Sequence, residues 1–201
     1  MDNLIADYYI ILLKKGISSK GKKMIQKITL VLINIIFGSL VLLSYYKGLN
    51  KEPELSLKLW GGVPKILQPY IVASMFISAL GYFFFTINFL INTDPQHIKF
   101  LGKFNFWYLH IIYLMILIPS AMWIDLTFTY MKTGNIIDWY YVISTLYCVA
   151  IFSIILLLFT VDTYVNNSSW LYMASVFGVS IFTFHTMFLD GLIWTVFFNR
   201  N

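Results

Sequence analysis

Two titratable residues, His185 and Asp190, lie inside a long apolar stretch near the end of the chain, residues 170–198. A charged side chain at the centre of a bilayer costs about 2.5–3.5 kcal/mol, so such residues usually face a bundle interior, a partner or water. Histidine changes its charge near physiological pH, and a neighbouring carboxylate stabilises its protonated form. These two residues therefore predict a site that handles protons or binds the polar part of a small molecule.

The spacing of His185 and Asp190 separates them if the segment is α-helical. Five residues correspond to about 140° around an α-helix, whereas Thr183, Thr186 and Asp190 fall on one face. With a rise of about 1.5 Å per residue, Asp125 of another apolar segment falls in the same outer layer as His185. We therefore expect His185 to pair with Asp125, with Asp190 and Thr186 on a second polar surface of the same outer layer.

A second polar layer is expected on the inner side of the membrane, formed by His110, Asp162 and Asn88. We favour a hydrogen-bonding or packing role for His110, and headgroup exposure or helix capping for Asp162. Asn88 continues a stripe of small and polar residues that includes Ser74 and Ser78. Such a stripe predicts a close helix contact, with the wall of a cavity as the alternative.

No motif for a metal, a cofactor or a known catalytic centre accompanies these residues. HxxxH, HxxE, CxxC, G-x-S-x-G, P-loop and Gly-rich dinucleotide patterns are all absent, and Cys148 is the single cysteine. His110 and His185 differ in expected depth by about 14 Å, too much for opposite ligands of one haem iron. We therefore expect neither a metal nor a cofactor, and we assign no catalytic residue.

The elements that must position these residues are membrane-spanning helices. Apolar residues make up 59% of the 201 residues and charged residues only 11%, far below the roughly 25% of a soluble domain. We predict an all-α integral membrane protein, a bundle of about five transmembrane helices, since each apolar stretch can cross the roughly 30 Å hydrocarbon layer. The predicted spans are residues 26–46, 66–91, 104–124, 138–161 and 170–198.

Residues 1–23 are predicted to form a unit separate from the bundle of residues 24–201. Residues 1–15 carry apolar side chains at helical spacing but are too short to span, so they predict a short amphipathic helix at the membrane surface. Residues 16–23 are expected to be a flexible basic linker. Six of the fourteen basic residues lie in the first 27 positions, which favours a cytoplasmic N-terminus.

The leading functional hypothesis is a membrane protein that binds or transports a small molecule or a proton through the outer polar layer. One alternative is an integral membrane enzyme that acts on a lipid or isoprenoid, with His185 and a carboxylate as acid and base. Another is an accessory subunit of a membrane complex. Expected partners are the lipid bilayer, an apolar or amphipathic small molecule, and a membrane-protein partner or second copy. Membrane topology accounts for the net charge of +5, so no nucleic acid is expected.

Overall fold

The computed structural model describes the backbone of residues 2–163 and 169–198, and the side chains of those residues from Ser19 onward. Five helices in this part are long and apolar enough to cross a membrane, which confirms the predicted all-α bundle of a multi-pass membrane protein. In chain order the elements are α1 (Asp2–Lys51), α2 (Pro53–Lys58), α3 (Gln68–Ile91), α4 (Trp107–Thr133), α5 (Ile136–Asp162), α6 (Trp170–Phe184), the π-helix η1 (His185–Trp194) and α7 (Thr195–Phe197).

The N-terminal linker expected at residues 16–23 is wrong, because α1 runs without a break from Asp2 to Lys51. Lysine is a good helix former, and a single glycine such as Gly21 weakens a helix by only about 1 kcal/mol. A Cβ added at Gly21 would meet no other atom within 4 Å, although Ser19 and Lys23 on either side of it contact the α3–α4 loop. The surface position expected for residues 1–15 stays a prediction, since their side chains lie outside the described residues.

Helix α4 is longer than the predicted span, which ended at residue 124. It continues through Asp125 and ends at Gly134, whose φ of 64° closes the helix in the left-handed conformation that glycine favours. Pro119 lies inside α4 without ending it. The adjacent helix α5 begins at Ile136, where the side chain of Asn135 accepts a hydrogen bond from the backbone N–H of Ile137 at 3.0 Å.

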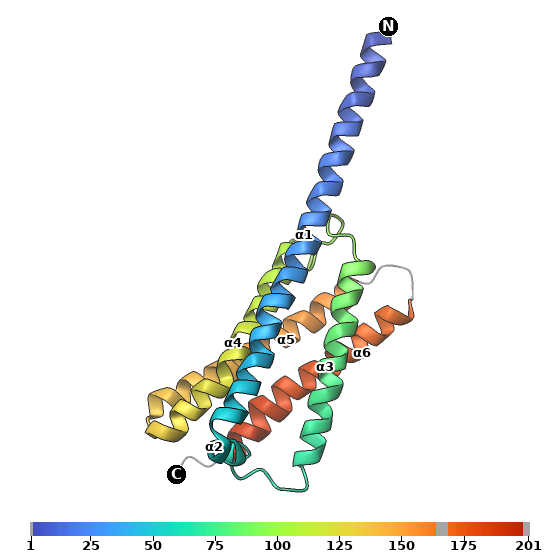
Figure 1. Cartoon of the computed structure of the whole chain (residues 1–201). Helices are drawn as coiled ribbons and strands as arrows, with labels where there is room; N and C mark the ends of the chain where they lie inside the picture. Colours follow the sequence, from blue (N-terminus) through green and yellow to red (C-terminus); the bar gives the residue numbers. More distant parts are fainter. Residues whose placement is uncertain (1, 164–168, 199–201) are drawn as a thin grey trace.

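The spanning helices pack in two groups that meet at the last span. Helix α4 packs against both α1 and α5, and α3 packs against α6 (Figure 1). Helix α5 also contacts α6 and η1, so the last span joins the two groups. Helices α1 and α3 are also linked directly, because the hydroxyl of Tyr82 donates to the side-chain oxygen of Asn34.

Small residues allow α3 and α6 to approach closely. A Cβ added at Gly81 would lie 2.6 Å from the Cα of Gly178, so the two backbones touch at this point. Ser175 donates a hydrogen bond to the carbonyl oxygen of Phe84 at 3.0 Å, across the same contact. The stripe of small residues on α3 therefore forms a close helix contact, as packing between membrane helices uses them.

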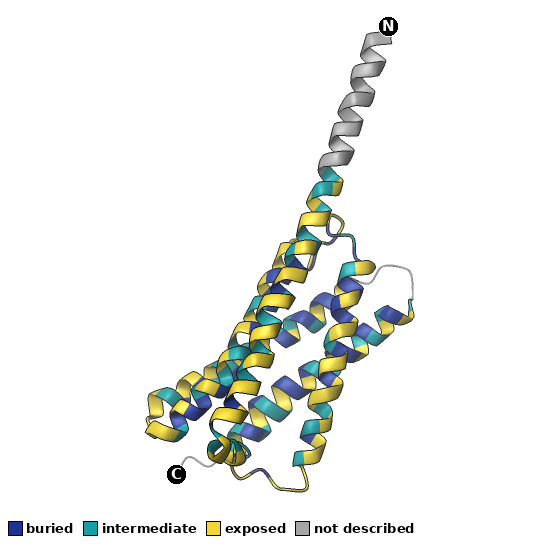
Figure 2. Cartoon of the chain, in the orientation of Figure 1, coloured by how far each residue is buried: buried dark blue, intermediate teal, exposed yellow. Residues whose placement is uncertain are grey.

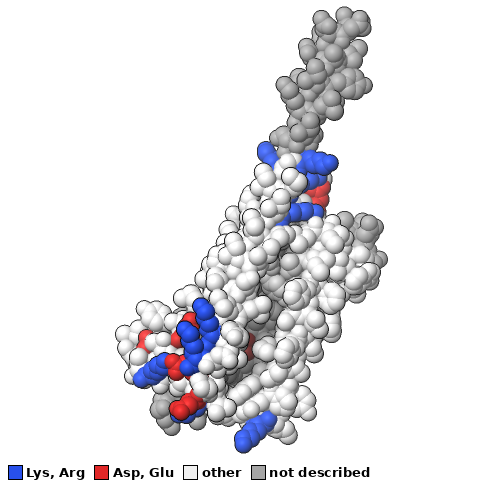
Figure 3. All heavy atoms as spheres, viewed as in Figure 1, with Lys and Arg blue, Asp and Glu red and all other residues white. Residues whose placement is uncertain are grey.

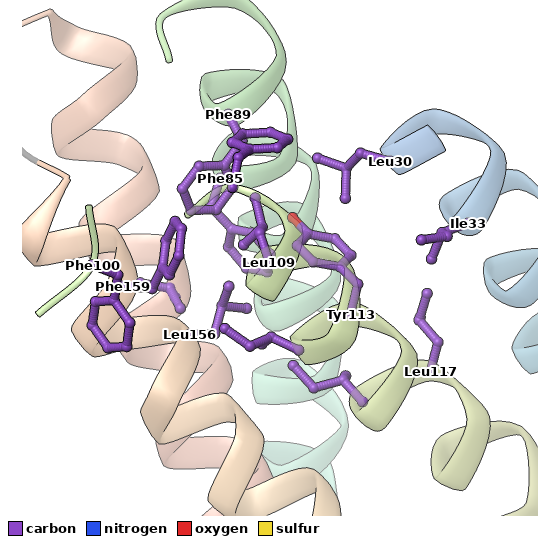
Figure 4. Packing of buried hydrophobic residues seen from close by; sticks show 14 of the residues in the cluster. Leu30, Ile33, Phe85, Phe89, Phe100, Leu109, Tyr113, Leu117, Leu156 and Phe159 are labelled. Carbon is purple, nitrogen blue, oxygen red and sulfur yellow. The ribbon is translucent and has the colours of Figure 1, made fainter. Parts of the chain in front are cut away.

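The core of the bundle consists of large apolar side chains from several spans. Figure 4 shows one cluster in which Phe85 and Phe89 of α3 meet Tyr113 of α4, Phe159 of α5 and Leu30 of α1. Apolar side chains also cover the outside of the helices, where exposed residues are drawn in yellow (Figure 2). An apolar exterior around an apolar core fits a helical bundle surrounded by lipid.

Charged side chains gather at the two ends of the bundle and leave a largely white surface between them (Figure 3). At the end that carries the α3–α4 loop, Lys23 of α1 binds Asp94 of this loop, with 2.5 Å between Nζ and Oδ2. At the opposite end Lys132 of α4 binds Glu52 next to α2, also at 2.5 Å. This distribution agrees with helices whose middle parts lie in the hydrocarbon layer.

Candidate functional site

The last span changes its winding where the two titratable residues lie. Helix α6 ends at Phe184, and the next ten residues, His185–Trp194, form the π-helix η1. In a π-helix each N–H bonds to the carbonyl five residues earlier, instead of four. Residues five positions apart therefore come to lie above one another, as residues four apart do in an α-helix. Such segments are rare and are often found at functional sites.

The π-helix brings His185 and Asp190 together. Nε2 of His185 lies 3.4 Å from Oδ2 of Asp190, within ion-pair distance. The predicted separation of about 140° was wrong because it assumed α-helical winding through the whole span. His185 is buried, with 8% of its side chain exposed, whereas 36% of the Asp190 side chain remains exposed.

Ser74 of α3 completes a chain of three polar side chains. Its Oγ lies 3.2 Å from Nδ1 of His185, so the imidazole bridges Ser74 and Asp190. A neutral imidazole donates from one nitrogen and accepts at the other, and a serine hydroxyl can do either. The three side chains can therefore pass a proton between Ser74 and Asp190. The polar stripe on α3 was the sequence signal for Ser74, although it pointed to packing.

Three aromatic side chains, from α1, α4 and η1, lie beside these three polar residues. The hydroxyl of Tyr45 is close enough to Asp190 to interact with its charge. The ring of Tyr45 is 6.0 Å from that of Trp123, and the Trp123 ring is 5.3 Å from that of Trp194. The indole N–H of Trp194 donates to the carbonyl of Leu59 at 2.7 Å. The buried indole N–H of Trp123 has no hydrogen-bond partner among the described residues.

The other two residues predicted for the outer layer lie elsewhere. Asp125 is exposed on α4 and is in ion-pair contact with no described residue, so the expected pair with His185 does not form. Thr186 is buried and faces α5, where its Oγ1 lies 2.9 Å from Oγ of Ser153. Thr183 binds the backbone carbonyl of the same serine at 3.0 Å. The depth of a residue along a helix carries no information on the direction in which its side chain points, so it could not predict these contacts.

The residues predicted for the inner layer do not share one site. His110 is buried on α4, with Nε2 2.8 Å from the carbonyl oxygen of Gln26 on α1. Asp162, at the end of α5, accepts a backbone N–H from Leu101 at 2.8 Å. Asn88 is buried and its side-chain oxygen accepts a hydrogen bond within the last turn of α3 at 2.9 Å. Each residue therefore has a separate structural contact.

Asp94 forms a further charged cluster, at the end of the bundle that carries the α3–α4 loop. It contacts Nζ of Lys23 at 2.5 Å and Nδ1 of His97 at 2.9 Å, and it accepts the backbone N–H of Gln96 at 3.1 Å. Partial burial alone raises the pKa of the Asp94 carboxyl, but these hydrogen bonds and the charge of Lys23 outweigh it and lower the pKa to about 2. The cluster ties α1 to the α3–α4 loop.

Two further features of the described residues concern possible ligands. No group of three or more His, Cys, Asp and Glu side chains in this part of the chain could hold a metal ion. A groove of about 380 Å³ lies between α4 and α5, but its lining is apolar and excludes His185 and Asp190. The residues that line it are Pro119, Met122, Leu126, Tyr141, Ser144, Thr145 and Cys148.

The face between α1 and α3 is hollowed, and acidic side-chain atoms are visible at its depth (Figure 3). We call this feature the lateral hollow. In Figure 1 the last span passes behind it, with Tyr45 on α1 and Ser74 on α3 as the neighbours of Asp190 and His185. Comparison of the chain with models of protein families, with characterised proteins and with solved structures gave no match.

Proposed function

We propose that this multi-pass membrane protein binds a small amphipathic molecule in the lateral hollow, with the polar part of the molecule at His185 and Asp190. The observation that carries the proposal is the 36% exposure of the Asp190 side chain within an otherwise apolar span. A carboxylate that serves only the fold is normally enclosed and fully bonded, because an unpaired charge at this depth is costly. Partial exposure instead leaves room for a ligand to supply the missing contacts.

The position of the hollow supports an amphipathic ligand. Its walls, α1 and α3, are apolar over lengths sufficient to cross a membrane, which suits a hydrocarbon tail. The basic N-terminal segment favours a cytoplasmic N-terminus, and this orientation places His185 and Asp190 in the outer half of the bilayer. Proton exchange along Ser74, His185 and Asp190 would couple binding, and any transport that follows it, to pH.

The proposal is tested by identifying what the protein retains when it is purified from native membranes. Organic extracts of wild type, His185→Phe and Asp190→Asn are compared by mass spectrometry. We expect a compound in near-equimolar amount with the wild type and at least about tenfold less with either variant, since truncating a desolvated polar contact costs 2 kcal/mol or more.

The matched control is Asp138→Asn. Asp138 also lies towards the end of the bundle where α4 and α5 are connected, but it is half-buried and accepts a hydrogen bond from Thr133 at 2.6 Å in the α4–α5 turn. This variant should retain the compound. Equal recovery of every small molecule from wild type, His185→Phe and Asp190→Asn, all three of them folded, would refute a binding role for the site.

A lipid-directed hydrolase is the second candidate, because Ser74, His185 and Asp190 occur in the order hydroxyl, imidazole, carboxylate that serine hydrolases use. The interior position of Ser74 in α3 argues against it. Backbone N–H groups there are engaged in the helix and cannot form an oxyanion hole. A fluorophosphonate probe decides between the two: labelling that Ser74→Ala abolishes would favour the hydrolase, and no labelling favours binding alone.

A further inference from the structure

We propose that the ligand bound at Asp190 carries a cationic head group, an amine or a quaternary ammonium. This inference rests on the proposed function and specifies the class of molecule. It follows from two properties of the site, the charge that surrounds Asp190 and the aromatic ring beside it.

Asp190 is a carboxylate with little positive charge around it. Lys and Arg are absent from residues 28–46, 66–91, 104–131 and 136–198, so the apolar parts of all five spans contain no permanent cation. Among the described residues His185 is the basic group in ion-pair contact with Asp190, and it also faces Ser74. Ser74 on α3 and Tyr45 on α1 are the other polar groups near the pair, and neither carries positive charge. A cationic ligand therefore supplies the counter-charge that the chain lacks.

The ring of Tyr45 provides a second attraction for a cation. It is the aromatic side chain that interacts with the charge of Asp190. Its neighbours Trp123 and Trp194 pack ring against ring, with centroids 6.0 Å apart between Tyr45 and Trp123 and 5.3 Å apart between Trp123 and Trp194, so they support Tyr45 and enclose no separate space. The face of a tyrosine ring attracts a cation by about 0.5–2 kcal/mol, depending on how far water is excluded.

The unpartnered N–H of Trp123 also fits a ligand rather than packing alone. A buried donor without an acceptor costs about 1–3 kcal/mol, so its persistence calls for a partner that binds there. An oxygen next to the cationic group of the ligand would serve. An anionic head group, in contrast, would be repelled by Asp190, and a neutral head group would supply no positive charge beyond that of His185.

The test uses a simple probe, tritiated octyltrimethylammonium, with the full-length protein in nanodiscs of a galactolipid that carries no charged head group. Two competitors are compared with the unlabelled probe. The first is 2,2-dimethyldecane, in which a carbon atom replaces the nitrogen and the shape is kept. The second is octanoate, which reverses the charge. We expect saturable binding that the unlabelled cation displaces and that neither competitor affects.

Four variants locate the bound cation. Asp190→Asn should weaken binding by about tenfold or more, since it removes a desolvated charge partner. Tyr45→Leu should weaken it by about fivefold, and Tyr45→Phe, which keeps a ring face but loses the hydroxyl next to Asp190, should weaken it less. Asp138→Asn is the control for a distant carboxylate and should also match the wild type.

Equal displacement by the carbon isostere, or unchanged binding by Asp190→Asn, would overturn the inference. The outcome is distinguishable from failure of the proposed function. If a neutral or anionic compound is recovered from native membranes and is lost in Asp190→Asn, the site binds a ligand of another class. If no compound depends on the site, the proposed function itself fails.

Discussion

Gly81 and Gly178 hold α3 and α6 at backbone contact, and this contact fixes the wall of the site that carries Ser74. A Cβ at either glycine would lie 2.6 Å from the Cα of the other. Backbone atoms cannot move aside as a flexible side chain can, so the helices themselves must separate. The small size of these two residues is thus required by a specific neighbour.

Replacing Gly178 with alanine should therefore destabilise the bundle by about 1–3 kcal/mol, the usual cost of overpacking. The measurement is the thermal unfolding midpoint in a mild detergent. Gly38→Ala on α1 is the matched control, because a Cβ there meets no atom within 4 Å. It should leave the midpoint unchanged or raise it, since alanine favours the helix. Equal midpoints for the two variants would contradict the contact.

At the scale of elements, η1 is an α-helix that contains one extra residue. A π-turn arises when a residue is inserted and the hydrogen bonds around it lengthen from four to five positions. The flanking turns keep their register, which is why Thr183 and Thr186 still reach Ser153 while Asp190 reaches His185. In an α-helix with one residue fewer, the histidine and aspartate would be four apart and would still meet.

Deleting Met187, which is exposed and lies between His185 and Asp190, should thus be tolerated. The span becomes α-helical, and we expect a folded bundle that retains the ligand, measured by size-exclusion chromatography and the mass-spectrometric assay. Deleting Phe177, an exposed residue in α6, should abolish folding, because it rotates the following residues by about 100° and moves Gly178 away from Gly81. Equal damage from both deletions would show that η1 is not a simple insertion.

The elements also show what could be predicted from the sequence. Length and apolar composition determine whether a segment can cross lipid, so the five spans were predictable. The π-helix was not, because His185–Trp194 contains no proline, and the single glycine Gly191 does not by itself specify a change of winding. That one change decided whether His185 meets Asp190. The predicted pair of Asp125 with His185 was wrong for another reason. The depth of Asp125 could be estimated from the sequence, but the direction of its side chain depends on how α4 packs.

At the scale of the whole molecule, polar contacts tie α1 to the rest of the bundle at the end that carries the α3–α4 loop. Lys23 of α1 binds Asp94, and Ser19 donates to the side chain of Gln96 at 2.6 Å. Both contacts attach α1 to the loop between α3 and α4. Tyr82 and Asn34 also connect α1 with α3 directly. The two helices are thus joined at and near this end, and they flank the lateral hollow (Figure 3).

The contacts of Asp94 predict that the stability of the protein decreases in acid. Because the folded pKa of Asp94 is lowered to about 2 from 3.8, the stability it contributes is present above about pH 4 and is lost as the pH falls through about 2. Asp94→Asn should therefore unfold at a lower temperature than wild type at pH 6, and the difference should shrink below pH 4. Glu54→Gln, at an exposed residue of α2, should follow the wild type at every pH. A difference independent of pH would exclude the carboxylate charge as its source.

Because the lateral hollow opens sideways, the ligand concentration that determines its occupancy is the concentration in the bilayer. A molecule that enters between α1 and α3 comes from the bilayer, where amphiphiles accumulate far above their level in water. Occupancy then depends on the number of ligand molecules per lipid, and dilution of the aqueous phase has little effect. Adding empty vesicles should weaken the apparent affinity in proportion to the lipid added, although the protein and the site are unchanged.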